Sequence, residues 1–93
     1  QGRREEALGY LREALRLEPD YHDARNNLGA ALRDSGNLQE SVVELQRVIK
    51  AQPQMAAAHL NLAFSYSLLG RNEEATEHYQ IARRLNPAIP ALR

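Results

Sequence analysis

"ARNNLGAALRDSG", residues 24–36, has a close copy in "AHLNLAFSYSLLG", residues 58–70. In both stretches an Asn precedes a Leu and a small residue, and both stretches end on Gly. The copies are 34 residues apart, and Pro19, Pro53 and Pro87 keep the same interval. A repeat of this length is typical of arrays in which each repeat is one supersecondary unit that stacks on its neighbours.

Each repeat divides at a Gly into two helical halves. Small and apolar residues recur at helical spacing between Pro19 and Gly36, and again between Gly36 and Pro53. Gly36 and Gly70 are expected to end helices, because Gly tolerates the left-handed conformation at that position. Asp20 is expected to cap the helix that follows it. The predicted helices are 3–17, 21–34, 38–51, 55–69 and 72–85, and no strand pattern is present.

Length and composition restrict the classes of protein to which this chain can belong. The chain has 93 residues, of which 43% are hydrophobic and 26% charged, so it predicts one small globular unit. Basic and acidic residues number 12 each, and a nucleic-acid partner is not expected without a basic excess. The absence of Cys excludes disulfides and Cys-ligated metals. We expect no membrane insertion, because no apolar run is long enough. The compartment stays open, with the cytoplasm favoured.

This pattern resembles the tetratricopeptide repeat family. The family's Leu-Gly pair is matched by Leu28-Gly29 and Leu62-Ala63, and its final Pro by the periodic Pro residues. Its second-helix Ala is matched by Ala7 and Ala75, with Ser41 in the middle copy. The chain departs from the family at the early Trp, where Arg25 and His59 stand instead.

The resemblance implies an all-α fold, a right-handed α-solenoid of helix-turn-helix hairpins with five helices and about two and a half repeats. The expected division is a half repeat at 1–21, repeats at 22–55 and 56–89, and a stub at 90–93, in a fragment of a longer protein. Small residues such as Gly29 and Ala63 are expected where helices cross closely. Incomplete ends also predict a homo-oligomer or helix-swapped dimer at high concentration.

The resemblance further implies a concave face that is lined by the first helix of each repeat and binds a protein or peptide. Asn27 and Asn61 occupy the same lining position, and their amides could hold the main chain of an extended peptide. The alternative is that both face solvent or bond a neighbouring helix. The other predicted lining residues include Asp23, Asn26, Arg33, Leu60, Phe64 and Leu68.

The kind of ligand that this face would bind depends on its apolar stripe and on its charged residues. Leu60, Phe64 and Leu68 form one helical stripe, which either takes an apolar side chain of a partner or packs against a following repeat. The carboxylate clamp of chaperone-binding members is not expected, because Asp23 and Ala57 stand at its Lys positions. A ladder of Asn, as in repeats attached to some glycosyltransferases, is the nearer likeness.

No arrangement of residues predicts catalysis. The three His lack metal-ligand spacing, the Ser residues lack a nucleophile elbow, and the Gly residues mark turns. We therefore expect no enzyme activity, no metal and no cofactor within this chain. The interpretation is a scaffold for a protein or peptide partner. The alternatives are a self-assembly module, or the substrate-presenting arm of a larger enzyme.

Overall fold

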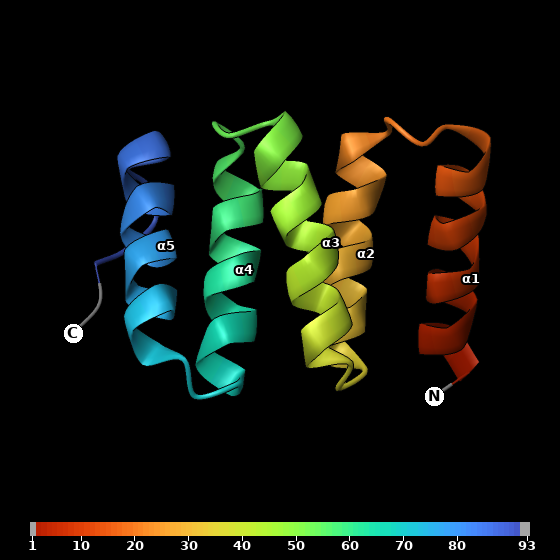
Figure 1. Ribbon diagram of the computed structural model, residues 1–93, viewed down its shortest axis with the longest axis horizontal. Helices are drawn as coiled ribbons and strands as arrows, with labels where there is room; N and C mark the ends of the chain where they lie inside the picture. Colours follow the sequence, from red (N-terminus) through yellow and green to blue (C-terminus); the bar gives the residue numbers. More distant parts are fainter. Residues whose placement is uncertain (1, 92–93) are drawn as a thin grey trace.

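A computed structural model describes residues 2–91 as a row of five helices. They are α1 (Gly2–Leu17), α2 (His22–Asp34), α3 (Leu38–Ala51), α4 (Ala56–Leu68) and α5 (Asn72–Leu85). Figure 1 shows them side by side in chain order, with neighbours running in opposite directions. The all-α hairpin architecture is confirmed, and each predicted helix end lies within one residue of the observed one.

The first helix of each repeat ends as the Gly periodicity predicts. Gly36 and Gly70 have φ of 86° and 79°, in the left-handed region. After α2, the N–H of Asn37 donates to the carbonyl of Leu32 over 2.8 Å, and the N–H of Gly36 donates to that of Arg33. This pair of bonds is the Schellman motif, and the same pair follows α4.

The start of α2 differs from the prediction that Asp20 is its cap. Tyr21 holds the N-cap position, and no side chain caps the helix. The N–H of Tyr21 donates to the carbonyl of Glu18, so residues 18–21 form a turn and the helix begins after it. Asp20 lies inside this turn, one residue before the cap position, and the prediction was wrong.

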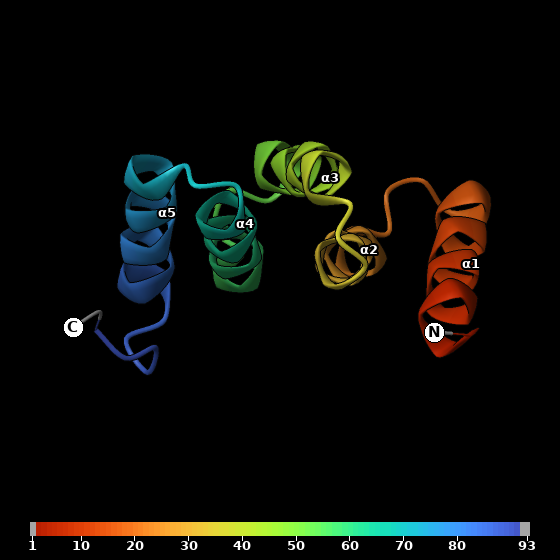
Figure 2. The ribbon, with the colours of Figure 1, turned by 90° about the horizontal axis from the view of Figure 1, so that it is seen from below.

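The helices form two layers. Viewed along their axes, α2 and α4 lie on one side of the row and α3 on the other (Figure 2). Each helix packs on the next in the chain, and α2 also contacts α4. The first helices of successive repeats therefore share one face. Within residues 2–91, none of the helices has the length and apolar character needed to cross a membrane.

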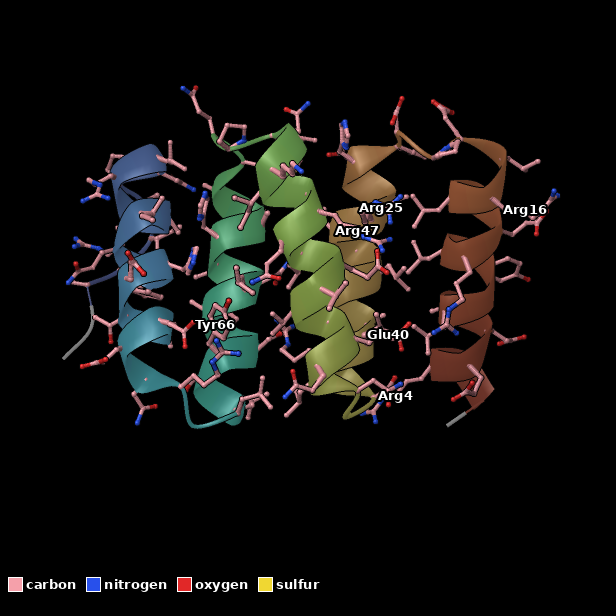
Figure 3. The ribbon with its side chains drawn as sticks, in the orientation of Figure 1. Arg4, Arg16, Arg25, Glu40, Arg47 and Tyr66 are labelled. Atoms are coloured by element: carbon pink, nitrogen blue, oxygen red, sulfur yellow. The ribbon has the colours of Figure 1, made fainter. Side chains whose placement is uncertain are left out.

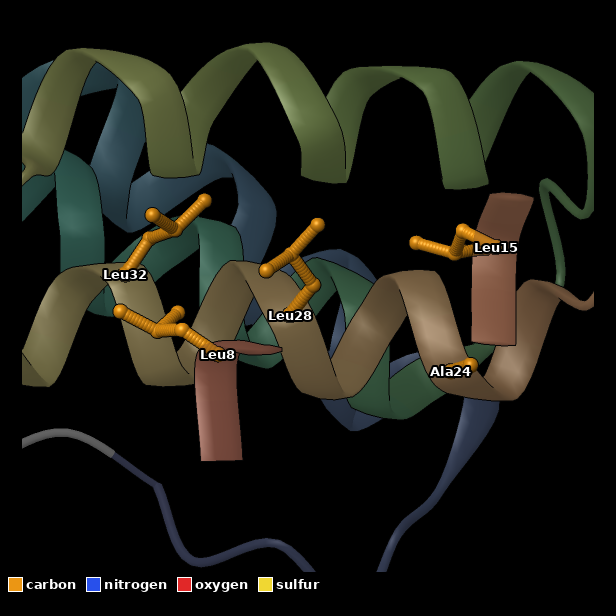
Figure 4. Close-up of a cluster of buried hydrophobic side chains, with 5 residues drawn as sticks. All are labelled: Leu8, Leu15, Ala24, Leu28 and Leu32. Carbon is orange, nitrogen blue, oxygen red and sulfur yellow. The ribbon is translucent and has the colours of Figure 1, made fainter. Parts of the chain in front are cut away.

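The hydrophobic core lies between repeats. One cluster joins α1 to α2, and the close-up in Figure 4 shows its members Leu8, Leu15, Ala24, Leu28 and Leu32. A second cluster joins α3 to α4 through Val42, Leu45, Leu62 and Tyr66. Both clusters cross a repeat boundary, so each repeat depends on its neighbour for burial.

Small and polar residues let the helices of the first hairpin approach closely. A Cβ at Gly29 would lie 2.5 Å from Cγ of Leu45, so only Gly fits there without a shift. Ser41 is fully buried, and its hydroxyl donates to the carbonyl of Gly29 over 2.7 Å. Because that proton is committed, the Ser65 hydroxyl donates to the Ser41 oxygen at 2.8 Å. A Ser therefore replaces the family's Ala without leaving a buried polar group unpaired.

Candidate functional site

A chain of polar side chains joins the two first helices on their shared face. The Asn61 amide on α4 donates to Oδ1 of Asn26 on α2 over 3.1 Å. The guanidinium of Arg33, which lies further toward the C-terminal end of α2, donates to Oδ1 of Asn61, also over 3.1 Å. Asn26 is only 8% exposed, and its oxygen accepts this bond in a buried position. Asn61 is thereby held in one orientation.

The Asn61 amide keeps half of its bonding capacity. An Asn side chain has two N–H donors and an oxygen with two lone pairs, and one of each is used by Asn26 and Arg33. Asn61 is half-buried, and within the described residues its second N–H and second lone pair make no further side-chain bond. Asn27, its copy, lies exposed on α2. The two predicted equivalents therefore have different surroundings.

Arg33 and Phe64 extend the polar chain into an apolar surface. The guanidinium carbon of Arg33 lies 5.5 Å from the centroid of the Phe64 ring, within cation–π distance. Nε of Arg33 also lies 3.4 Å from the carboxylate of Asp34. Phe64 is 43% exposed, so a substantial part of its ring remains open to solvent.

An open cavity of about 310 Å³ lies beside Phe64, between α4 and α5. Its walls are mostly apolar, and the lining residues are Ala63, Phe64, Ser67, Asn72, Ala75, Thr76 and Tyr79. Glu73 and Glu77 on α5 lie exposed next to Thr76. Sequence reasoning missed the contribution of α5. The 34-residue register was the available signal, because it relates Tyr79 to Leu45, a core residue of α3.

The remaining predicted lining residues lie around this centre. Leu60 is half-buried, whereas Leu68 at the other end of the predicted stripe is 64% exposed. Asp23 is exposed near the start of α2. Of the predicted residues, the structure joins Asn26, Arg33, Asn61 and Phe64 in one cluster. In the part of the chain described, no group of three or more metal-ligating side chains comes together.

This geometry defines a solenoid of helical hairpins, with a polar and apolar surface along its first helices. The chain belongs to the tetratricopeptide repeat family, whose family model matches residues 1–54 and 32–92. It is 38% identical over 78 residues to the TPR repeat-containing thioredoxin TTL4 of Arabidopsis thaliana, covering 84% of this chain and 11% of that protein.

Two further similarities agree with the assignment. The Protein O-mannosyl-transferase TMTC3 of Homo sapiens is 32% identical over 76 residues, covering 82% of this chain and 8% of the transferase. The crystal structure of YrrB, "a TPR protein with an unusual peptide-binding site", is 28% identical with a TM-score of 0.84, covering 90% of this chain and 43% of that one. The chain thus spans about a tenth of the length of the thioredoxin TTL4 and of the transferase TMTC3.

Proposed function

We propose that this chain is a scaffold that binds a peptide or partner protein on the face formed by α2 and α4. The observation that carries the proposal is the orientation of Asn61, whose bonds to Asn26 and Arg33 leave one N–H and one lone pair unbonded on the helix that also carries Phe64. A peptide residue offers one carbonyl and one N–H, which match those two free groups.

The predicted residues take different roles in this proposal. Asn61 and Asn27 hold the ligand main chain, and Asn26 acts by fixing Asn61. Phe64, with Leu60 and Leu68 at either end of the stripe, receives an apolar side chain. Arg33 and Asp23 supply charges at the polar edge of the surface. The peptide-binding site for which YrrB is described supports this class of function for the fold.

The test is a peptide selected from a random phage-displayed library against the full chain, with affinity measured by fluorescence polarisation. Phe64→Ala should weaken binding about tenfold or more, because it removes an aromatic anchor. Asn61→Ala should weaken it about two- to tenfold, the range of one or two hydrogen bonds. Asn27→Ala tests the second Asn in the same way.

The matched control is Gln39→Ala, an exposed change on α3, which lies on the opposite side of the row. Its affinity should equal that of the wild type. Circular dichroism of each variant separates loss of contact from loss of fold. Equal affinity of wild type and Phe64→Ala would place the binding surface elsewhere and overturn the proposal.

Two alternative functions have specific support and separate tests. The open cavity and the exposed Leu68 favour a self-assembly module, which predicts a mass that rises with concentration in light scattering. A strict monomer over a wide concentration range would exclude it.

Similarity to the transferase TMTC3 favours the substrate-presenting arm of a larger enzyme. A parent protein without a catalytic domain would exclude that alternative.

A further inference from the structure

The first repeat contains an ion pair that ties its two helices together and to the preceding turn. Nη1 of Arg25 on α2 lies 2.7 Å from the Glu44 carboxylate on α3. Nη2 of Arg25 donates to the carbonyl of Pro19 over 3.0 Å. Figure 3 shows Arg25 on α2 with Arg47 on α3 close by, and Arg47 also approaches Glu44, at 3.8 Å.

The second repeat makes the same contacts with two His. The positions 34 residues after Arg25 and Glu44 are His59 on α4 and His78 on α5. Nε2 of His59 lies 2.9 Å from the carbonyl of Pro53, the copy of Pro19. Nδ1 of His59 lies 3.0 Å from Nδ1 of His78, and the two rings stack with centroids 5.2 Å apart. A pair that changes charge near neutral pH thus replaces a permanent ion pair.

The hydrogen bonds determine where the protons of the pair sit. The Pro53 carbonyl can only accept, so Nε2 of His59 carries the hydrogen. Neutral His59 then has a bare Nδ1, and Nδ1 of His78 must be the donor between the rings. One added proton goes to the free Nε2 of His78 and leaves both bonds intact. A second must go to Nδ1 of His59, where it meets the N–H of His78 at 3.0 Å.

The surroundings oppose added charge on the pair. His59 is only 4% exposed. Burial, and to a lesser extent the neighbouring His59, lowers the pKa of His78, while Glu77 and Glu74 on α5 act in the opposite direction.

Other charged and polar groups reach this cluster from the adjacent elements. The Tyr66 ring on α4 lies 5.7 Å from that of His78, and the Arg71 guanidinium, from the turn before α5, lies 4.7 Å from the Tyr66 centroid. From α3, the Gln46 amide donates to the Tyr66 oxygen over 3.0 Å. Nε of Arg71 is itself paired with the Glu74 carboxylate over 2.6 Å, so its positive charge is compensated beside the pair.

We infer that the His59–His78 pair makes the α4–α5 hairpin a pH-sensitive element, which stays packed with at most one added proton and loosens when the second binds. The inference goes beyond peptide binding, because it concerns the packing of the second repeat. The first repeat has an Arg–Glu ion pair at the corresponding positions, so it lacks a His pair there.

The sign of the effect follows from proton counting. In the unfolded chain both rings bind a proton below the ordinary His pKa of about 6.5, whereas the folded pair accepts at most one. Unfolding therefore takes up about one extra proton at acidic pH. The stabilisation is present above about pH 6.5 and is lost as pH falls below that value, because the second proton that the unfolded chain binds has no site in the intact pair. The lowered pKa of His78 acts in the same direction. The unfolding equilibrium constant should rise by up to about tenfold for each pH unit.

The test compares urea unfolding from pH 8 to pH 5 for the wild type and the double variant His59→Arg/His78→Glu, which copies the Arg25–Glu44 pair into the second repeat. All other titrating groups are common to both chains, so the difference isolates the pair. We expect the wild type to lose stability more steeply, by up to about tenfold in the equilibrium constant per pH unit. Parallel pH dependences would overturn the inference.

A measurement on the wild type keeps the inference testable if the double variant does not fold. Nitrogen-15 NMR of the rings at pH 8 should show the Nε2–H tautomer at His59 and the Nδ1–H tautomer at His78. On acidification, one ring should take up a proton while the fold persists. An Nε2–H tautomer at His78, or protonation of both rings in the folded state, would contradict the inference.

Discussion

α3 and α5 occupy the same position in successive repeats, yet one is covered and the other is open. Leu45 on α3 is fully buried, because α4 packs over it. Its copy on α5, Tyr79, lines the open cavity and donates its hydroxyl to the carbonyl of Pro90. Two hairpins of the same geometry therefore differ in what covers them.

The difference teaches that a repeat does not supply its own core. α3 presents Val42 and Ile49 to α4, whereas α5 has Thr76 and Arg83 at the corresponding positions. Nε of Arg83 donates to the carbonyl of Ile89, so the segment after α5 takes up part of this polar face. Burial in such an array comes from nearest neighbours, so helices of the same register bury different residues.

The largest expected effect separates the covered face from the open one. Leu45→Ala should lower the free energy of unfolding by about 2–5 kcal/mol, because it leaves a cavity in a packed core. Tyr79→Ala should cost about 1 kcal/mol or less, since its side chain already borders open space. Urea unfolding monitored by circular dichroism measures both. Equal costs would show that α5 is as well packed as α3.

A smaller effect is expected at the crossings within the two hairpins. Gly29→Ala should cost about 1–3 kcal/mol, because the added methyl group overlaps Leu45. Ala63→Gly, the reciprocal change in the second repeat, should cost only about 0.5–1 kcal/mol through the helical preference of Ala. The same unfolding measurement applies. A stabilising Gly29→Ala would mean that Leu45 moves aside freely.

The smallest effect concerns the two Asn that the sequence made equivalent. Asn61→Ala should cost about 0.5–1.5 kcal/mol, because its bonds to Asn26 and Arg33 are lost. Asn27→Ala should change stability by less than about 0.5 kcal/mol, as is usual at exposed positions. If the two variants had the same free energy of unfolding, the contacts of Asn61 would contribute nothing to stability.

Local signals in the sequence predicted most of the backbone. Gly36 and Gly70 ended their helices in the expected left-handed conformation, and the periodicity placed every helix. The prediction failed at Asp20, where residue type alone did not reveal the turn that shifts the helix start to His22. The residue that takes the capping position is set by the backbone conformation of the preceding turn. Residue type alone can therefore misplace the cap by one position.

The candidate site was predictable only in part. The concave lining was inferred by register, and register treats Asn27 and Asn61 as equal. The structure gives Asn61 partners on the neighbouring helix and leaves Asn27 exposed. The contact between His59 and His78 was not foreseen, although the copies of Arg25 and Glu44 were available in the same register.

By itself the sequence determined the repeat, the five helices, the helix ends marked by Gly36 and Gly70, and the family, because these follow from periodicity, turn residues and spacing along one chain. The tertiary structure decided which copy of each residue is buried, bonded or open. Equivalent positions meet different neighbours across a repeat boundary, and burial and hydrogen bonding are properties of the pair rather than of either residue. For that reason Asn61 is oriented while Asn27 is exposed, and the cavity lies beside Tyr79 rather than Leu45.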